Sequence, residues 1–234
     1  KEIKLAYYST ISFVDAQVGR IINKLKQTGL DKNTIVVFIS DHGYHMGEHG
    51  HWQKQTLFEN ATKVPLIIKV PGLEPESHKT KSPVELIDIF PTLMDLTNIV
   101  SPPHLVGKSL KPIIQKKSSF IRENALTRWR NGYSLKTERF RLTKWNMKGD
   151  FQYELYDHKY DNEELENLAL NSNYKVVLDS LIKTIDTRII EANLKPHGLG
   201  RQINNVQPIT KPFNLTYGDL HDENGKRYFF KSKN

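Results

Sequence analysis

The feature that most constrains the fold of this chain is an unbroken apolar run that follows a long amphipathic segment. The run TIVVFI, residues 34–39, contains only β-branched and aromatic side chains. Such a run is typical of a strand buried on both faces, as in a parallel sheet. Residues 5–27 precede it, and their apolar side chains recur at spacings of three and four, which predicts a helix with one apolar face. That face is formed by Ile11, Val14, Val18, Ile21 and Leu25.

Two further segments extend this pattern. Residues 64–72, VPLIIKVPG, predict a second short buried strand that ends at Pro71. Residues 82–99 predict a strand that passes into a helix, with Pro91 in the first turn of the helix. Helices that alternate with buried strands indicate a layered α/β domain.

The sequence pattern changes after about residue 116, from helices alternating with apolar strands to a series of short strand-like runs. Residues 120–156 contain alternating strand-like runs, and Asn131-Gly132 between the first two is a hairpin signal. These runs predict a small antiparallel sheet. Residues 172–193 predict a helix with one apolar face, which we expect to pack on that sheet.

We therefore divide the chain into three parts. Residues 1–116 are predicted to be the α/β part with the histidine-rich loop described below, and residues 117–194 a small α+β subdomain. Residues 195–234 lack periodicity and are predicted to be an irregular tail.

Composition excludes several classes of function. The chain of 234 residues has a net charge of +8 but no long basic run and no nucleic-acid-binding motif, so we expect no nucleic-acid partner. A solvated lysine-rich surface explains the charge, and attraction to an acidic polysaccharide is the alternative. The absence of cysteine excludes thiolate metal sites and a cysteine nucleophile in this chain. No apolar run approaches the roughly 20 residues that span a membrane.

The loop SDHGYHMGEHGHWQK, residues 40–54, directly follows the predicted strand 34–39. Ligand sites of α/β sheets lie at the carboxyl ends of strands, where Asp41 and His42 stand. Aspartate offers an oxygen ligand and histidine a nitrogen ligand, so the pair suits part of a metal site. The pair alone supports equally well a turn capped by Asp41 beside a solvated His42. Any complete metal site needs further ligands from elsewhere.

Residues 45–49 match H-x-x-E-H, a zinc-protease pattern that requires a helix. Gly43, Gly47 and Gly50 surround the two histidines, and each glycine costs about 1 kcal/mol in a helix. We therefore interpret this match as chance.

Longer segments carry a likeness to a known family. They are YYSTISFVDAQVGRIINKL, NTIVVFISDHGYHMGEHGHWQKQTLFENATKVPLIIKVPG, SPVELIDIFPTLMDL, GYSLKTERFRLTKW and ELYDHKYDNEELENLA, in this order. Together, over roughly residues 5–170, they resemble the sulfatase family of the alkaline-phosphatase superfamily, in particular its iduronate-2-sulfatase-like branch. The resemblance implies the C-terminal half of such a protein. Its fold would be part of a mixed sheet flanked by helices, plus a small antiparallel sheet with a packed helix.

The resemblance also implies roles for individual residues. Asp41 and His42 match the pair that binds the family's Ca²⁺, and Lys54 matches a catalytic lysine that contacts the sulfate of the substrate. His42 is alternatively a catalytic residue that holds the sulfate ester or its leaving group, which ranks Asp41 above it as a metal ligand. His49, Trp52 and His45 are the further candidates for contacts with the substrate. A packing role is the alternative for Trp52, and an ordinary surface position for Lys54.

Two expected parts of a sulfatase are not found in this sequence. The formylglycine nucleophile would derive from a C/S-x-P-x-R motif, and paired aspartates would complete the calcium site; both are expected upstream of residue 1. We therefore expect this chain to be inactive alone and to need the N-terminal half of the same protein, in one chain or as a separate one.

The resemblance implies a sulfuric ester hydrolase that acts on a sulfated carbohydrate. A phosphonate or phosphodiester hydrolase of the same superfamily is the first alternative, and a non-catalytic module that binds polyanions is the second. The family also implies export, to the periplasm, the lysosome or the medium, although no signal sequence is visible in the chain.

Overall fold

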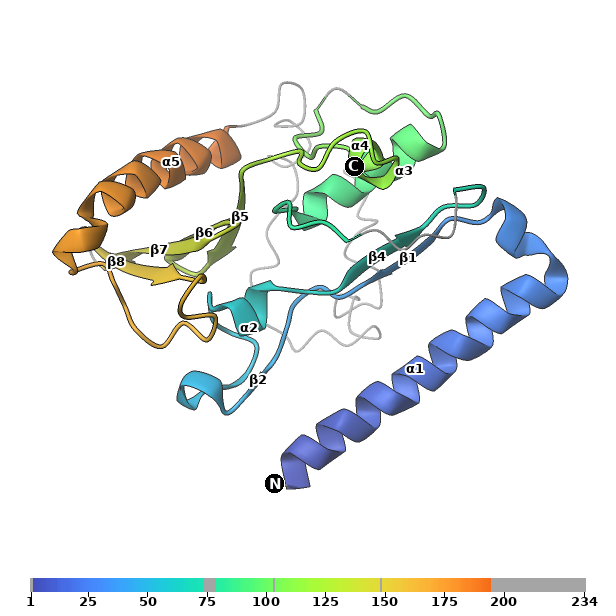
Figure 1. Ribbon diagram of the computed structural model, residues 1–234, viewed down its shortest axis with the longest axis horizontal. Coiled ribbons are helices and arrows are strands. Elements are labelled where there is room, and N and C mark those ends of the chain that lie inside the picture. The colour runs from blue at the N-terminus through green and yellow to red at the C-terminus, as the bar shows by residue number, and fades with distance from the viewer. Residues whose placement is uncertain (1, 74–78, 103, 148, 195–234) are drawn as a thin grey trace, which may run out of the picture. The chain divides into compact units, whose positions relative to one another are not determined.

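The computed structural model describes residues 2–73, 79–102, 104–147 and 149–194. Residues 1–193 form one compact unit, shown in Figure 1. The predicted irregular tail, residues 195–234, lies outside the described residues. The predicted division near residue 116 stays a prediction. No helix in the described ranges combines the length and apolar character needed to cross a membrane.

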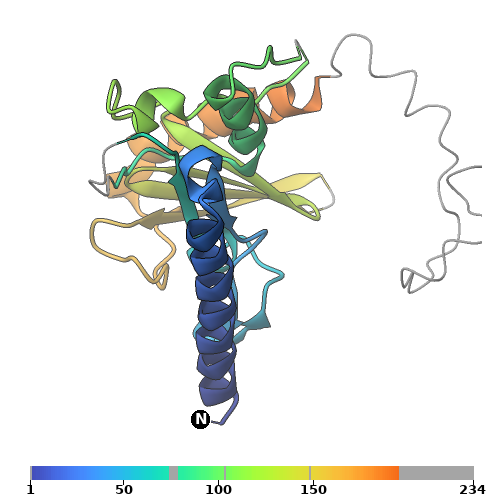
Figure 2. The same ribbon diagram turned by 90° about the vertical axis from the view of Figure 1, so that its right-hand side faces the viewer.

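The chain begins with α1 (Glu2–Thr28), which confirms the predicted helix and appears as the blue ribbon in Figure 2. Gly29 follows it with φ 71°, a left-handed conformation that suits glycine at a helix end. None of the residues of α1 is buried, and Ile21 on its predicted apolar face is 63% exposed. The apolar face is therefore uncovered in the described part of the chain.

After a 3₁₀ turn (Leu30–Asn33), β1 (Val36–Ile39) pairs antiparallel with β4 (Leu66–Lys69). Both strands fall within the predicted runs. The predicted parallel arrangement and the burial on both faces were wrong, because Phe38 and Ile39 are exposed and the pair is antiparallel. An apolar run indicates that a strand can be buried, but it does not specify which strands lie beside it. The described residues add no third strand to this sheet.

The segment predicted as a strand passing into a helix is only half confirmed. A 3₁₀ turn (Leu86–Asp88) leads into α3 (Ile89–Leu96), with Pro91 buried in its first turn, whereas the described residues before the turn form no strand. A capping box fixes the start of the helical segment, because the Glu85 and Asp88 side chains each accept a backbone N–H of the other's residue. The short helix α4 (Lys111–Ile114) follows.

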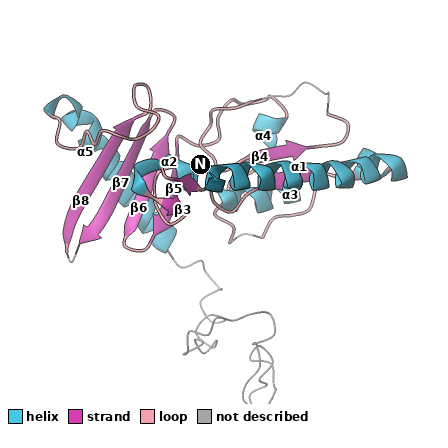
Figure 3. Cartoon of the chain, turned by 90° about the horizontal axis from the view of Figure 1, so that it is seen from below, coloured by secondary structure: helices cyan, strands magenta, loops and turns pink. Residues whose placement is uncertain are grey.

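The predicted small antiparallel sheet is confirmed. Four strands lie in chain order: β5 (Asn124–Trp129), β6 (Gly132–Thr137), β7 (Phe140–Met147) and β8 (Asp150–Asp157). The predicted helix is also confirmed, as a 3₁₀ turn (Ser172–Tyr174) and α5 (Lys175–Asn193), which lies along one face of the sheet (Figures 1 and 3). The core between them consists of Leu135, Leu142, Leu155, Leu168, Leu181 and Ile185.

The opposite face of this sheet is polar but buried. Side chains alternate along a strand, so Ser134 and its cross-strand partner Thr143 point away from the leucine core, as does Arg141. The short helix α2 (Glu59–Thr62) meets this face, because Arg141 forms an ion pair with Glu59. The sheet therefore joins α5 on one side to the segment that follows the histidine-rich loop on the other.

Candidate functional site

The histidine-rich loop folds as a short hairpin, not as a helix. Its strands β2 (His45–Met46) and β3 (Trp52–Gln53) pair antiparallel, with a 3₁₀ turn (Glu48–Gly50) between them. Gly47 and Gly50 have φ values of 108° and 69°, which an α-helix does not permit. The interpretation of the H-x-x-E-H match as chance is confirmed.

The structure brings together three of the predicted site residues. Lys54 Nζ lies 2.7 Å from His42 Nε2, and Asp41 Oδ2 lies 3.5 Å from the same nitrogen. Asp41 Oδ1 also accepts a hydrogen bond of 3.1 Å from the backbone N–H of His42. We call Asp41, His42 and Lys54 the Asp-His-Lys cluster. The Asp41 side chain is 82% exposed, so its carboxylate is open to a ligand from outside this chain.

The partners of His42 fix which ring nitrogen carries the proton. His42 Nδ1 lies 2.8 Å from the carbonyl oxygen of Gly43, which can only accept, so Nδ1 is the protonated nitrogen. In the neutral ring, Nε2 then presents a lone pair, which accepts a hydrogen bond from Lys54 Nζ. The cluster therefore holds one carboxylate, one imidazole lone pair and one ammonium group side by side.

Gly43 anchors the cluster to α2. Its backbone N–H donates to the Ala61 carbonyl over 2.8 Å. A Cβ atom at this position would lie 1.9 Å from the backbone oxygen of Asn60, so only glycine permits this approach of two backbones.

The other predicted substrate contacts divide into one exposed residue and two packed ones. Trp52 is exposed. His45 is fully buried, with Nε2 2.6 Å from Thr56 Oγ1 and Nδ1 without a partner in the described structure. His49 stacks on Phe58 with ring centroids 3.9 Å apart. Contacts of these three residues with a substrate stay a prediction, and in this chain His45 and His49 face protein.

Burial also sets the charge of His45. Desolvation by burial lowers the pKa of His45, and the nearby imidazoles of His49 and His51 lower it further. The ring is therefore held neutral over a wider pH range than a free histidine, which suits a packing role beside Phe58.

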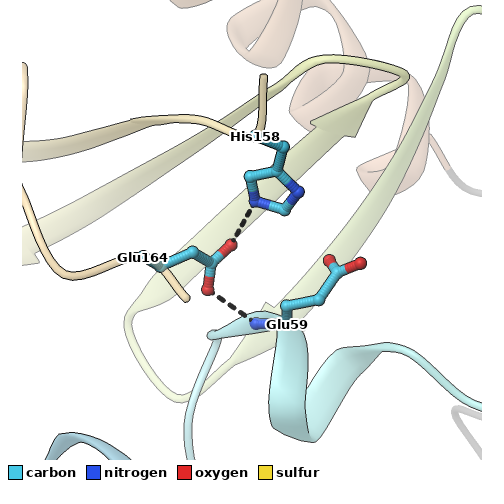
Figure 4. Close-up of side chains that lie close together, drawn as sticks. All are labelled: Glu59, His158 and Glu164. Atoms are coloured by element: carbon cyan, nitrogen blue, oxygen red, sulfur yellow. Dashed lines mark hydrogen bonds and ion pairs between the residues drawn. The ribbon is translucent and has the colours of Figure 1, made fainter. Parts of the chain in front are cut away.

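A second group of polar side chains, which the sequence analysis missed, lies where α2 meets the sheet. Ligand-type atoms of Glu59, His158 and Glu164 lie within 4.8 Å of one another, and Figure 4 shows these side chains. His158 Nε2 donates to one carboxylate oxygen of Glu164 over 2.7 Å, and the other oxygen accepts the backbone N–H of Glu59 over 2.7 Å.

Arg141 identifies this group as an ion network and argues against a metal site. Its guanidinium donates to both carboxylates, those of Glu59 and Glu164. Burial opposes ionisation of Glu164, but the His158 hydrogen bond and the Arg141 charge outweigh it and lower the pKa of Glu164. A metal ion would have to displace a cation that already compensates both acids.

The mixed α/β part and the antiparallel sheet with its helix have the fold of an alkaline-phosphatase-like domain. Solved structures agree. A 2-O GAG sulfatase matches with a TM-score of 0.70 and 27% identity over 83% of this chain and 45% of that one. A phosphonate monoester hydrolase from Silicibacter pomeroyi matches with a TM-score of 0.70 and 28% identity over 80% of this chain and 40% of the other.

Sequence comparison adds a likeness to the sulfatases. The family model named Sulfatase matches residues 2–99. A sulfatase of Formosa agariphila is 36% identical over 77% of this chain and 35% of its own length. Iduronate 2-sulfatase of Mus musculus is 35% identical over 44% of this chain and 23% of its own length. The chain is a relative of the sulfatases, which confirms the predicted likeness, and it spans about a third of the length of the Formosa relative.

Proposed function

We propose that this chain is part of a sulfatase that hydrolyses sulfate esters of a sulfated saccharide. The observation that carries the proposal is the Asp-His-Lys cluster at the end of β1, in a chain related to sulfatases. The relatives named as a 2-O GAG sulfatase and an iduronate 2-sulfatase support a saccharide as the substrate.

The chemistry of the cluster suits this reaction. A sulfate ester is negatively charged, and its charge must be compensated before a nucleophile can approach the sulfur atom. The ammonium group of Lys54 can compensate part of that charge as a fixed electrostatic stabiliser. His42 holds Lys54 by accepting its hydrogen bond at Nε2. The lone pair of Nε2 would bind a metal ion only in place of this hydrogen bond, and Nε2 would donate to an ester oxygen only when it carries a proton.

The donor set fits part of a calcium site. Ca²⁺ takes six to eight ligands, mostly oxygen, and Asp41 offers an exposed carboxylate. We assign Asp41 as the stronger ligand and His42 as the weaker one, because imidazole nitrogen is less usual for Ca²⁺. When bound, the ion would add positive charge beside the sulfate group. The remaining ligands and the formylglycine belong, in this proposal, to residues upstream of this chain.

The uncovered face of α1 supports an N-terminal partner. A helix with an amphipathic pattern and no buried residue needs a covering element, which the described residues do not provide. We propose that the N-terminal half of the same protein covers it, and that the mature protein is exported, as the family resemblance implies. The boundary between an α/β part (residues 1–116) and a small subdomain (residues 117–194) belongs to the same proposal.

The test uses the longer protein that contains this chain. Lys54→Ala should lower kcat/KM for an aryl sulfate by about 10²–10³-fold, as removal of one electrostatic stabiliser does elsewhere. Lys175→Ala is the control, because Lys175 is an exposed lysine on α5. Chelation of divalent cations should abolish turnover, and Asp41→Asn should raise the Ca²⁺ concentration needed to restore it. Full activity of Lys54→Ala would overturn the proposed role of the cluster.

Phosphonate or phosphodiester hydrolysis is the second candidate, because a phosphonate monoester hydrolase shares this fold at 28% identity. Rates on matched aryl sulfate and aryl phosphodiester substrates separate the two. A protein that binds sulfated polysaccharide without turnover, and does so after chelation and with Lys54→Ala, would instead be a binding module.

A further inference from the structure

Arg141 is one of the most completely bonded side chains of the described structure. It lies on β7 with its side chain 2% exposed. Nη1 donates to Ser134 Oγ over 2.9 Å, and the remaining donors reach the carboxylates of Glu164 and Glu59. A planar guanidinium that is bonded in three directions fixes the relative positions of all its partners.

One of those partners belongs to α2, a helix of only four residues. Glu59, the first residue of α2, contacts Arg141 through its side chain and Glu164 through its backbone N–H. These partners are 82 and 105 residues away in the sequence. A helix this short has little stability of its own, so its position depends on these contacts with the sheet.

The helix α2 in turn supports both ends of the Asp-His-Lys cluster. Ahead of α2, Leu57 is buried and Thr56 is hydrogen-bonded to His45, so the six residues from Lys54 to Glu59 are held in place. Near the end of α2, the Ala61 carbonyl accepts the N–H of Gly43, the residue next to His42. The 2.7 Å contact between Lys54 and His42 therefore joins two chain segments, and each of them is held by α2.

We propose that Arg141 is a positioning residue for the proposed sulfatase site, acting through α2 on Lys54 and His42. It does not touch the cluster. It sets where α2 lies, and α2 sets the relative position of the lysine that faces the sulfate and the histidine that holds the lysine. This inference rests on the proposed function, because it concerns the use of the same cluster.

The chain provides a matched control in Arg122. Arg122 is also buried, with its side chain 3% exposed, and it also bridges two carboxylates, those of Glu85 and Asp88. Neither of these partners belongs to the loop 40–54 or to α2. Arg122→Lys and Arg141→Lys therefore make the same chemical change in equally buried networks, and only one of the networks supports the cluster.

The experiment measures kcat, KM and thermal midpoint in the longer protein, for both variants, each with Lys54 intact and with Lys54→Ala. We expect Arg141→Lys to lower kcat/KM by at least tenfold when Lys54 is present and by less than twofold when it is absent. Arg122→Lys should lower the thermal midpoint to a similar degree and change kcat/KM by less than twofold in either background.

The background dependence distinguishes positioning from general loss of stability. An equal loss of activity for Arg141→Lys in both backgrounds, or for both arginine variants, would overturn the inference. If Arg141→Lys does not fold, Glu59→Gln replaces it in the experiment. Glu59→Gln removes one charge at the edge of the network, and we expect it to lower kcat/KM about threefold when Lys54 is present and not when Lys54 is replaced by alanine. Full activity of Lys54→Ala would defeat the proposed function itself, whereas a loss of about 10²–10³-fold for Lys54→Ala beside a fully active, folded Arg141→Lys defeats only this inference.

Discussion

Helices α1 and α5 have the same kind of sequence pattern but different surroundings. In α5 the apolar face lies against the antiparallel sheet, and Ile185 is 0% exposed. In α1 no residue is buried, and Ile21 is 63% exposed. An amphipathic pattern thus identifies the face that needs covering but not the element that covers it. For α5 that element is the sheet that shortly precedes it in sequence, and for α1 the described residues provide no such element.

The largest expected difference between the two helices is in their response to loss of apolar side chains. Ile185→Ala should destabilise this chain by about 2–5 kcal/mol, because it leaves a cavity in the leucine core. Ile21→Ala should change its stability by less than about 0.5 kcal/mol, because an exposed side chain loses little burial. Urea denaturation followed by circular dichroism measures both. A cost for Ile21→Ala near that of Ile185→Ala would show that α1 is covered.

Two glycines sharpen the comparison at the level of the backbone. At Gly43 a Cβ would meet the Asn60 carbonyl at 1.9 Å, so Gly43→Ala should destabilise by about 1–3 kcal/mol or more through overpacking. At Gly19 within α1 a Cβ meets nothing within 4 Å, so Gly19→Ala should stabilise by about 0.5–1 kcal/mol through helix propensity. Thermal unfolding of the two variants checks both signs. Tolerance of alanine at residue 43 would mean that the loop and α2 are not in close contact.

Acid should affect the histidine-rich loop before the sheet. Because the folded pKa of His45 lies below its ordinary 6.5, its contribution to stability is complete above pH 6.5 and declines as the pH falls toward the folded pKa. The folded pKa of Glu164 lies below its ordinary 4.5, so its contribution declines only as the pH falls below 4.5. Asp157 behaves like Glu164, because hydrogen bonds from Arg139 lower its pKa. Burial raises the pKa of Glu154, so protonation of Glu154 in acid offsets part of the stability that Glu164 and Asp157 lose.

Tryptophan fluorescence can separate the two regions, because Trp52 lies in the loop and Trp145 on β7 of the sheet. The difference between the wild-type chain and Trp52→Phe gives the signal of Trp52 alone. We expect the Trp52 signal to change as the pH falls below 6.5 and the remaining signal only as it falls below 4.5. A single shared transition would contradict the different surroundings of His45 and Glu164.

Periodicity predicted the elements whose partners lie close in sequence. Alternating runs predicted the strands from Asn124 to Asp157, and α5 follows within twenty residues of them. The sequence pattern of each of these elements and the element that packs against it therefore lie in one short stretch of chain. Residues 34–39 were equally clear as a strand, yet their pairing was wrong. The pairing of a strand depends on the other strands of its sheet, and the apolar run contains no information about them.

The site shows the same limit. Asp41, His42 and Lys54 were predicted from a short segment and a family resemblance, and the structure places them in contact. Arg141 was missed, although a charged residue in a half-buried strand indicates an acidic partner. That partner, Glu59, is 82 residues away, and no local pattern connects the two.

The two-stranded sheet of β1 and β4 has a consequence for the chain as a molecule in solution. Each strand pairs with only one neighbour among the described residues, so each presents an outer row of free N–H and C=O groups. Pro65 and Pro71 flank β4 and Lys69 lies within it, features that discourage an additional strand there. The VVFI sequence of β1 has no charge and no proline. The outer edge of β1 is thus a template for self-association, and chains prepared at high concentration should join through this strand unless another strand occupies it first.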